Sequence, residues 1–436
     1  MSNIKNQQEI LEKLGISALN EMQHAAQAVI ADSKDTVIIS PTGTGKTVAF
    51  LLPVLEMLNP DLDKVQVVII VPSRELALQI EQVVRDMGTG FKANAVYGGR
   101  SGAKDKIELS HPPAILIATP GRLADHLRRD AIDAASIEIL ILDEFDKSLE
   151  VGFEKELREI MAALPNLKKK ILTSATEKTA IPDFLEITTP QYLHFPEEAE
   201  SKLTLRVIES PGDDKLEGLV NLLKYLGTGN GIIFCNFKDS IQEVSDFLAE
   251  AEIRHATFHG SLEQKEREHA LIKFRNGTHR LLLATDLAAR GIDVPELDFI
   301  IHFELPPKAD EFTHRNGRTA RMHSEGTAYI LKSEKRSLPE FIANAETFEI
   351  PFAEAPADTL WETLFITGGR KDKISKGDIA GLFFKEGKLE KGELGEIELK
   401  QDCAYVAVPH QKAEDMVTTL NNSRLKKKKV RISVLD

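Results

Sequence analysis

The hydrophobic positions of the first part of the chain fall into short continuous runs separated by longer amphipathic stretches. The runs occupy residues 37–39, 65–71, 93–96, 114–118, 137–142 and 170–173. Because they show no polar alternation, they are typical of strands that are buried on both faces. Their regular alternation with helical stretches predicts a parallel, doubly wound α/β sheet.

The same pattern begins again after a polar, turn-rich stretch around residues 195–214, where we expect a linker. The new runs occupy residues 231–235, 255–258, 280–284, 299–302 and 327–331. They predict a second α/β domain of similar design. We therefore expect one domain over residues 1–205, a second over 206–350 and a proline-containing linker over 351–361.

Residues 362–436 show a different pattern. Strands are predicted over 363–367, 395–399, 404–408 and 429–434, and helices over 376–385 and 412–420. A βαββαβ order in a segment of this size is the split-βαβ layout of RRM domains. The predicted fold class is therefore α/β, with two tandem doubly wound parallel-sheet domains followed by a small RRM-like domain.

Composition narrows the class of protein. With 436 residues, 42% of them hydrophobic and 28% charged, the chain is long enough for two or three globular domains. No run of about eighteen apolar residues is present, and the N-terminus lacks the pattern of a signal peptide. Cys235 and Cys403 lie far apart in the sequence, which argues against a disulfide framework or a metal cluster. We expect a cytoplasmic protein without membrane contact.

The charge is distributed unevenly. The whole chain carries −13, but residues 362–436 hold 15 basic and 12 acidic side chains, a net charge of +3. The basic excess gathers near the C-terminus, at Arg424, Lys426, Lys427, Lys428, Lys429 and Arg431. A basic run in a tail is more often a solvated face than a specific site, so its meaning depends on the surrounding domain.

A glycine-containing loop follows the run at 37–39 and leads into a helical stretch. It reads Ser-Pro-Thr-Gly-Thr-Gly-Lys-Thr, with candidate phosphate ligands at Thr42, Gly43, Thr44, Gly45 and Lys46. The backbone N–H groups of such a loop and the following helix N-terminus bind phosphates, and Lys46 reaches the terminal phosphates. The Thr47 hydroxyl is a candidate Mg²⁺ ligand. Serine or proline replaces the first glycine of the usual pattern, so a plain glycine-rich turn is the alternative.

Carboxylates follow a second buried run. Asp143 and Glu144 come directly after residues 137–142, at the strand end where parallel-sheet proteins keep their chemistry. Asp143 is the candidate Mg²⁺ ligand, Glu144 the base that activates water, and Asp146 completes the motif. Ser174 and Thr176 follow the next run and are placed to contact this motif. An acidic turn alone would be unremarkable, and the phosphate loop upstream favours the functional interpretation.

The second domain offers cations and polar groups for the same nucleotide. Arg318 and Arg321 are three residues apart and share one helical face, as two arginine fingers for the γ-phosphate would. Thr285 and Asp293 follow the run at 280–284. Asp293 is a candidate acceptor for ribose hydroxyls, whereas Thr285 is placed to face a phosphodiester. A solvated basic helix is the alternative for the arginines.

Together these motifs resemble the DEAD-box RNA helicases of superfamily 2 over residues 15–335. The resemblance includes the stretches 72–77, 98–99, 119–122 and 234–236 and a Q-x-x-R element at Gln264 and Arg267. It implies two RecA-like domains, ATP as the nucleotide, and coupling between the domains through Asp146, Ser174, Thr176 and His314. It implies contacts to the RNA backbone from Arg74, Gly99, Thr119, Arg122, Arg267, Thr285 and Asp286.

Two departures from the family pattern stand out. Phe145 replaces the alanine of the defining tetrapeptide, although the carboxylates are kept. Gln23 matches the glutamine that reads adenine, but no aromatic residue precedes it. We therefore expect ATP to be preferred over GTP with weakened selectivity.

Residues 376–381 and 404–409 resemble the RNA-binding domain of DbpA-type helicases. That resemblance implies binding of a hairpin in large-subunit rRNA and work on pre-ribosomal particles. Tyr405 is the single aromatic of its strand, and one stacked base is worth only about 1–3 kcal/mol. We therefore expect Lys426, Lys427 and Lys428 to supply phosphate contacts with a steep salt dependence.

The sequence thus predicts a monomeric, ATP- and Mg²⁺-dependent RNA helicase that remodels structured RNA, with large-subunit rRNA as the expected target. A general RNA helicase or an ATP-gated RNA clamp without a specific rRNA target is the alternative. A processive DNA translocase fits less well because Asp293 suits ribose hydroxyls.

Overall fold

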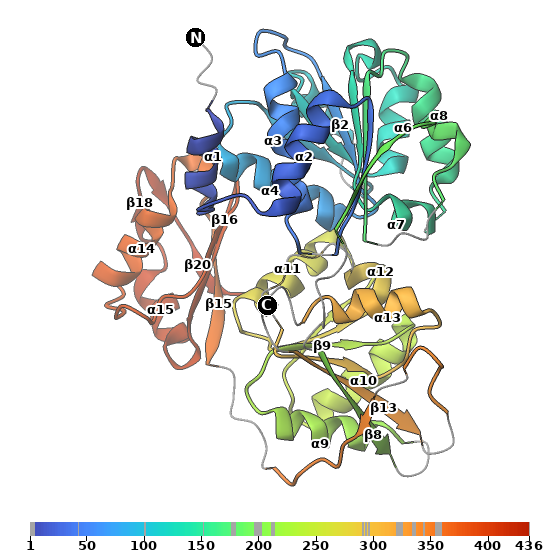
Figure 1. Cartoon of the computed structure of the whole chain (residues 1–436). Coiled ribbons are helices and arrows are strands. Elements are labelled where there is room, and N and C mark those ends of the chain that lie inside the picture. Colours follow the sequence, from blue (N-terminus) through green and yellow to red (C-terminus); the bar gives the residue numbers. More distant parts are fainter. Residues whose placement is uncertain are drawn as a thin grey trace. The chain divides into compact units, whose positions relative to one another are not determined.

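The computed structural model describes residues 5–41, 43–99, 102–150, 152–175, 180–195, 203–210, 214–289, 292, 294, 297–319, 326–333, 337–342, 345–353 and 360–435. Two compact units are present, with the division after Ser201 (Figure 1). None of the described helices is both long and apolar enough to cross a bilayer.

The first unit begins with two capped helices. In α1 (Gln7–Leu14) and α2 (Glu21–Asp32), Asn6 and Asn20 accept hydrogen bonds from the first-turn N–H groups, and Gly15 ends α1 at φ +69°. The sheet and its helices follow: β1 (Asp35–Ile39), α3 (Lys46–Met57), β2 (Val67–Ile70), α4 (Arg74–Met87), β3 (Ala93–Val96), α5 (Gly102–Leu109), β4 (Ile115–Ala118), α6 (Pro120–Arg128), β5 (Ile139–Leu142), α7 (Phe145–Glu150), α8 (Glu154–Ala163), β6 (Lys169–Ser174) and β7 (Gln191–His194).

These strands form one parallel sheet in the order β3-β4-β2-β5-β6-β1-β7. Helices cover both faces, so the central strands are fully buried, as their continuous apolar runs predict. Phe50 of α3 and Ile80 of α4 belong to the core on one face, and Leu123 of α6 and Ile160 of α8 to the core on the other. Strand β7 lies at the sheet edge and is mostly exposed, which explains why no apolar run marks it.

The second unit contains a sheet of the same design. Its elements are β8 (Leu203–Ser210), α9 (Leu216–Leu226), β9 (Gly231–Phe234), α10 (Lys238–Glu250), β10 (Ala256–Phe258), α11 (Gln264–Arg275), β11 (Leu281–Ala284), α12 (Asp286–Ala289), β12 (Phe299–His302), α13 (Ala309–Asn316), β13 (Gly326–Ser333) and β14 (Glu346–Thr347). Their order, β10-β11-β9-β12-β13-β8-β14, repeats that of the first sheet strand for strand.

The prediction of a linker around residues 195–214 is wrong for residues 203–210, which form a strand. Strand β8 lies there and pairs in parallel with β13 along its whole length, from Leu203 opposite Gly326 to Ser210 opposite Ser333. Strand β8 is only partly buried, and its sequence mixes apolar with polar residues, so no continuous apolar run marks it. The expected boundary at residue 205 would cut this strand, and we propose that the second domain begins before β8.

The βαββαβ prediction for residues 362–436 is confirmed. The elements are β15 (Trp361–Ile366), α14 (Lys376–Lys385), β16 (Ile397–Leu399), β17 (Ala404–Pro409), α15 (Ala413–Leu420) and β20 (Ile432–Val434), with a small hairpin of β18 (Arg424–Leu425) and β19 (Lys428–Lys429) before the last strand. The antiparallel sheet has the order β16-β17-β15-β20. Ile379 and Phe383 of α14 and Met416 and Leu420 of α15 pack on one face of this sheet.

Candidate nucleotide site and RNA-facing residues

The phosphate loop lies at the carboxyl end of β1, in the middle of the first unit's sheet. Gly43 and Gly45 have φ values of +83° and +87°, which glycine adopts without strain. Lys46 is buried, and its Nζ donates to the carbonyl oxygens of Ser40 at 2.5 Å and Pro41 at 2.7 Å. Thr47, the second residue of α3, is half-buried, and Thr42 lies outside the described residues. The Lys46 ammonium group is therefore held by the carbonyl groups at the start of its own loop.

The start of α2 holds this loop from outside. Gln23 Nε2 donates to the carbonyl oxygen of Gly45 at 3.4 Å, and Asn20 Nδ2 donates to that of Thr44 at 3.0 Å. A Cβ atom at Gly45 would lie 2.5 Å from Gln23 Nε2, and the φ of +87° at this position favours glycine. Gln23 Oε1 also accepts the Asn20 N–H at 3.0 Å. Sequence reasoning missed Asn20, although an asparagine three residues before a glutamine at a helix start is a capping-box signal.

The acidic motif follows β5, which is separated from β1 by the single strand β6. Leu142 of β5 pairs with Leu172 of β6, so Asp143 and Glu144 emerge next to Thr173. The Thr173 hydroxyl donates to the Asp143 carboxylate and accepts the Glu144 N–H at 3.2 Å. Burial raises the pKa of Asp143, while the bond from Thr173 and the charge of Lys46 oppose that rise. Phe145 joins the core beneath, which explains how a large ring replaces alanine.

Asp146 and Ser174 are both buried at this edge. Burial raises the pKa of Asp146, and among the described residues its carboxylate has no hydrogen-bond partner. The Ser174 carbonyl accepts the Ser40 N–H at 3.1 Å, which ties the end of β6 to the phosphate loop. Thr176 lies outside the described residues. The structure thus brings together the loop, the acidic motif and Ser174 in the first unit.

These residues fit a nucleoside triphosphate with a divalent cation. The positive-φ glycines and the N-terminus of α3 form a loop whose backbone N–H groups suit a phosphate anion. The Thr47 hydroxyl and the buried Asp143 carboxylate are hard oxygen donors of the kind Mg²⁺ prefers.

Some of the residues predicted to contact RNA in the first unit contact other residues of the protein instead. Arg74 begins α4 and approaches Gly99 so closely that a Cβ there would lie 2.9 Å from Arg74 Nη1. Arg122 Nε donates to Asp105 at 2.8 Å, and the buried Asp105 also contacts His126 Nε2 at 3.1 Å. Thr119 is the N-cap residue of α6. Asp105 therefore fixes the Arg122 side chain, a role that no sequence signal indicates.

In the second unit, Arg315 organises the carboxyl edge of the sheet. Its guanidinium is fully buried, donates to Asp286 at 2.7 Å, to Asn236 Oδ1 at 2.7 Å and to the Glu304 carbonyl at 2.6 Å. It also lies over the Phe234 ring, 4.9 Å from its centre. The Asp286 carboxylate, expected to contact RNA, thus forms an ion pair with Arg315.

The other predicted residues of the second unit lie on several elements. Thr285 follows β11, His314 is half-buried near the end of α13, and Arg318 is buried just after that helix. The Arg267 guanidinium on α11 lies over the Phe258 ring, 5.0 Å from its centre. Asp293 and Arg321 lie outside the described residues. The proposed arginine fingers and the coupling through His314 therefore stay predictions.

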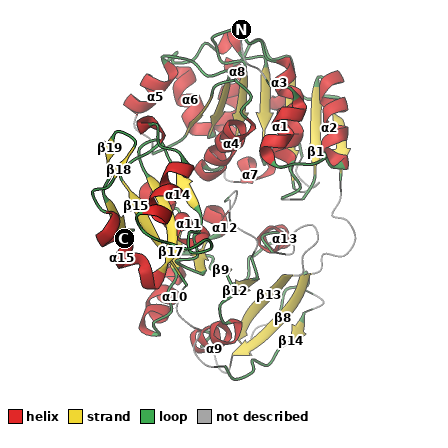
Figure 2. Cartoon of the chain, turned by 90° about the vertical axis from the view of Figure 1, so that its left-hand side faces the viewer, coloured by secondary structure: helices red, strands yellow, loops and turns green. Residues whose placement is uncertain are grey.

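Tyr405 is not available for base stacking, contrary to expectation. Tyr405 is 4% exposed because it packs against Ile272 of α11 and against Leu435 and Phe365. Its hydroxyl lies 3.5 Å from His269 Nε2. Helix α11 lies beside the strands of the C-terminal sheet (Figure 2). The open face of the C-terminal sheet, on which RRM domains stack bases, is here the contact with α11.

The lysine run forms the hairpin β18–β19, which the sequence did not predict. Lys426 forms an ion pair with Asp378 at 2.8 Å, and Lys428 one with Asp372 at 2.7 Å. Lys427 and Lys429 are exposed and form no ion pair within the described part of the chain. Only some of the expected lysine charges are therefore directed to solvent.

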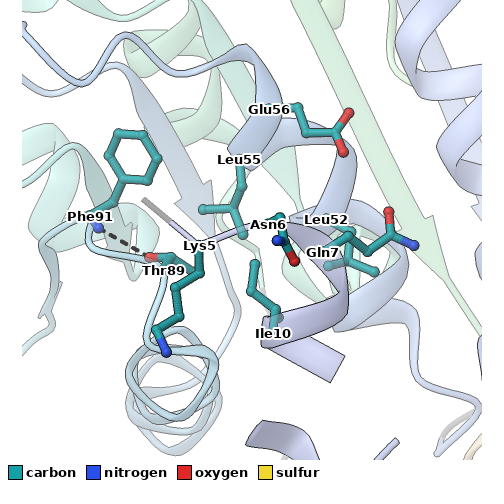
Figure 3. Close-up of a pocket in the computed structure, with 9 residues that line it drawn as sticks. All are labelled: Lys5, Asn6, Gln7, Ile10, Leu52, Leu55, Glu56, Thr89 and Phe91. Carbon is teal, nitrogen blue, oxygen red and sulfur yellow. Dashed lines mark hydrogen bonds between the residues drawn. The ribbon is translucent and has the colours of Figure 1, made fainter. Parts of the chain in front are cut away.

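A small cavity of about 160 Å³ lies away from this chemistry (Figure 3). Ile10 and the residues Leu52, Leu55 and Glu56 at the end of α3 line it, with Phe91 nearby. Lys46 begins that helix, so the cavity and the phosphate loop lie near opposite ends of α3.

A phosphate loop after β1, an acidic motif after β5 and a repeat of the same sheet define a P-loop nucleoside triphosphatase with two RecA-like domains. Comparison with known families refines this class. The DEAD/DEAH box helicase family matches residues 20–184, the helicase conserved C-terminal domain residues 214–323, and the DbpA RNA binding domain residues 363–434.

Curated relatives cover nearly the whole chain. The ATP-dependent RNA helicase DbpA of Bacillus subtilis is 30% identical over 99% of both chains. The Escherichia coli DbpA is 30% identical over 98% of this chain and 96% of its own length. The chain belongs to the DEAD-box RNA helicases of the DbpA type. The predicted family and the predicted ATP-dependent RNA helicase activity are thereby confirmed.

Solved structures support the same fold. S. cerevisiae Dbp5 bound to RNA and ADP BeF3 is similar with a TM-score of 0.66 and 25% identity, over 75% of this chain and 88% of that chain. Mss116 bound to ssRNA and UDP-BeF has a TM-score of 0.67 at 24% identity, over 80% of this chain and 79% of that chain, and shows the fold alone. The predicted fold class is confirmed.

Proposed function

We propose that this helicase remodels a structured hairpin of large-subunit rRNA on pre-ribosomal particles, as a cytoplasmic monomer. The observation that carries this proposal is the DbpA RNA binding domain at residues 363–434, whose open sheet face is covered by α11 while its hairpin β18–β19 exposes lysines. Recognition by phosphate contacts and shape suits a folded RNA better than a single strand, which needs exposed aromatic rings.

The nucleotide site would work through residues of the first unit. The phosphate loop and Lys46 bind the phosphates after Lys46 exchanges its bonds to Ser40 and Pro41 for phosphate oxygens. Thr47 and Asp143 would hold Mg²⁺, which neutralises charge on the phosphates. Glu144 orients the attacking water and accepts its proton. Arg318 and Arg321 would stabilise the charge that develops on the transferred phosphoryl group.

The test of this assignment is Glu144→Gln in the full chain. We expect ATP affinity within about threefold of wild type and RNA-stimulated turnover reduced by about 10² or more, because the amide cannot accept the proton. Glu154→Gln, an exposed residue of α8, is the matched control and should keep full activity. Normal turnover in the Glu144 variant would contradict the assigned role.

A further inference from the structure

One buried hydroxyl group forms hydrogen bonds to both Asp143 and Glu144 of the acidic motif. Thr173 is the penultimate residue of β6 and is fully buried. Its Oγ1 donates to the carboxylate of Asp143 and accepts the backbone N–H of Glu144 at 3.2 Å. Neither the family resemblance nor the motif spacing assigned any role to this residue.

The backbone of Glu144 needs such support. Its φ of +50° lies in the left-handed region, which residues with a Cβ atom rarely adopt. Strained conformations of this kind persist where surrounding contacts fix them, and they are concentrated at functional sites. The direction of the Glu144 side chain follows from this backbone conformation. The hydrogen bond from its N–H to Thr173 is therefore a contact that holds the side chain's direction.

Other backbone bonds anchor the motif as well: the Glu144 carbonyl accepts the N–H groups of Lys147 at 3.0 Å and Ser148 at 3.1 Å. The Asp143 N–H donates to the Ile70 carbonyl at 3.0 Å, which anchors the strand end but places no constraint on the carboxylate. The pairing of Leu142 with Leu172 fixes Thr173 opposite the motif. A buried valine would fill nearly the same volume, so packing alone does not require the hydroxyl.

We propose that Thr173 is a positioning residue for ATP hydrolysis, whose hydroxyl sets the orientation of the Asp143 carboxylate and of the Glu144 backbone together. This inference rests on the hydrolytic roles of Asp143 and Glu144 and does not depend on the rRNA target. Without the hydroxyl, Glu144 relaxes away from the water that it activates. Displacements of about 1 Å at such a site can cost about 10² in rate.

The test compares Thr173→Val and Thr173→Ser in the full chain. We expect Thr173→Val to lower RNA-stimulated kcat by about 10- to 100-fold with KM for ATP nearly unchanged, and Thr173→Ser to restore most of kcat. Hydrogen exchange of the peptide containing the Glu144 amide, measured without nucleotide or RNA, should be faster in the valine variant and normal in the serine variant. This second measurement does not depend on activity.

Thr36→Val is the matched control. Thr36 is a fully buried threonine of the adjacent strand β1, and its hydroxyl has no hydrogen-bond partner among the described residues. It should keep kcat and the exchange rate at Glu144. Wild-type kcat and exchange in Thr173→Val would overturn the inference, as would an equal loss in Thr173→Ser, since that variant lacks only the methyl group. If Thr173→Val does not fold, the serine variant still decides between hydroxyl and methyl.

Discussion

Gln23 is held by hydrogen bonds on both ends of its amide group. Its Oε1 accepts the Asn20 N–H and its Nε2 donates to the Gly45 carbonyl, so one residue joins the start of α2 to the phosphate loop. The amide retains one N–H and one lone pair for an adenine edge. We therefore expect Gln23 to influence nucleotide affinity through the shape of the loop as well as through any contact with the base.

We expect Gln23→Ala to raise KM for ATP about tenfold, because each lost hydrogen bond to the loop and cap is worth about 1 kcal/mol. The KM for GTP should rise by a similar factor if loop shape dominates. Gln27→Ala, a residue of α2 that bonds to Gln7 instead, is the control. Steady-state ATPase and GTPase rates check this, and an unchanged KM for both nucleotides would contradict the role in loop shape.

His302 makes the second unit sensitive to acid. It is fully buried between the rings of Phe234 and Phe312, with centroids 6.2 and 4.6 Å away, and bonds to Asn316 Oδ1 at 2.9 Å. Burial and the nearby Arg315 charge lower its pKa to about 3. The unfolded chain therefore binds a proton below about pH 6.5 that the folded chain does not, and stability falls as the pH decreases through that window.

Replacing His302 by glutamine should flatten this dependence. Between pH 7 and 5.5 the opening free energy of β12 should fall by about 1 kcal/mol more in the wild type than in His302→Gln. His279, whose pKa burial lowers to about 4, remains in both proteins and cancels in the comparison. Native-state hydrogen exchange, corrected for intrinsic rates, measures the difference. Equal slopes would contradict a buried neutral His302.

At the level of elements, helix α11 serves two parts of the second unit. Its first half carries Gln264 and Arg267 of the Q-x-x-R element, and its second half carries Ile272 and Arg275. Ile272 packs against Tyr405, and Arg275 forms an ion pair with Glu398 at 2.6 Å. Just beyond the helix, Asn276 and Thr278 bond to the buried hydroxyl of Thr363. These bonds measure 3.1 and 2.7 Å.

We expect Thr363→Val to loosen the contact between α11 and the C-terminal sheet, because the buried side chains of Asn276 and Thr278 lose this hydrogen-bond partner. The loss should destabilise the contact by about 1–3 kcal/mol. Hydrogen exchange should rise in β15 and in the residues after α11. Thr418→Val, whose hydroxyl bonds within α15 on an exposed surface, is the control. Unchanged exchange would show that the sheet is held without these bonds.

The hydrophobic pattern of the sequence predicts the elements that are well buried and misses those that are partly or fully exposed. The central strands are buried on both faces, so their apolar runs locate them, and α14 is found with its predicted bounds. Strand β8 mixes apolar with polar residues and β7 is mostly exposed, so neither forms a run. Partners far apart in sequence, such as Arg122 with Asp105 or Asp286 with Arg315, depend on the register of the sheet and leave no local signal.

For the whole molecule, the C-terminal domain supplies a basic surface to an otherwise acidic chain. Its covered sheet face leaves the hairpin β18–β19 as the candidate RNA contact, with Lys427 and Lys429 exposed. Deleting residues 362–436 would uncover Ile272 and the polar groups after α11, so charge variants in the full chain test RNA targeting more cleanly.

We expect the Lys427→Glu, Lys429→Glu double variant to need about tenfold more RNA for half-maximal ATPase stimulation. The log–log salt slope of RNA binding should become shallower by about 2, one step for each lost phosphate contact. Lys391→Glu changes another exposed lysine of the same domain and is the control. An unchanged RNA requirement and slope would place the RNA contact elsewhere.

The most direct test of the proposed role is the steady-state ATPase rate of the wild-type chain with three RNAs. They are a random single strand, an unrelated hairpin, and a large-subunit rRNA fragment that contains the peptidyl-transferase hairpin. We predict that the rRNA fragment stimulates at concentrations at least about tenfold lower than the other two, a difference of about 1.4 kcal/mol in binding. Equal stimulation by all three would contradict rRNA targeting and leave a general RNA helicase.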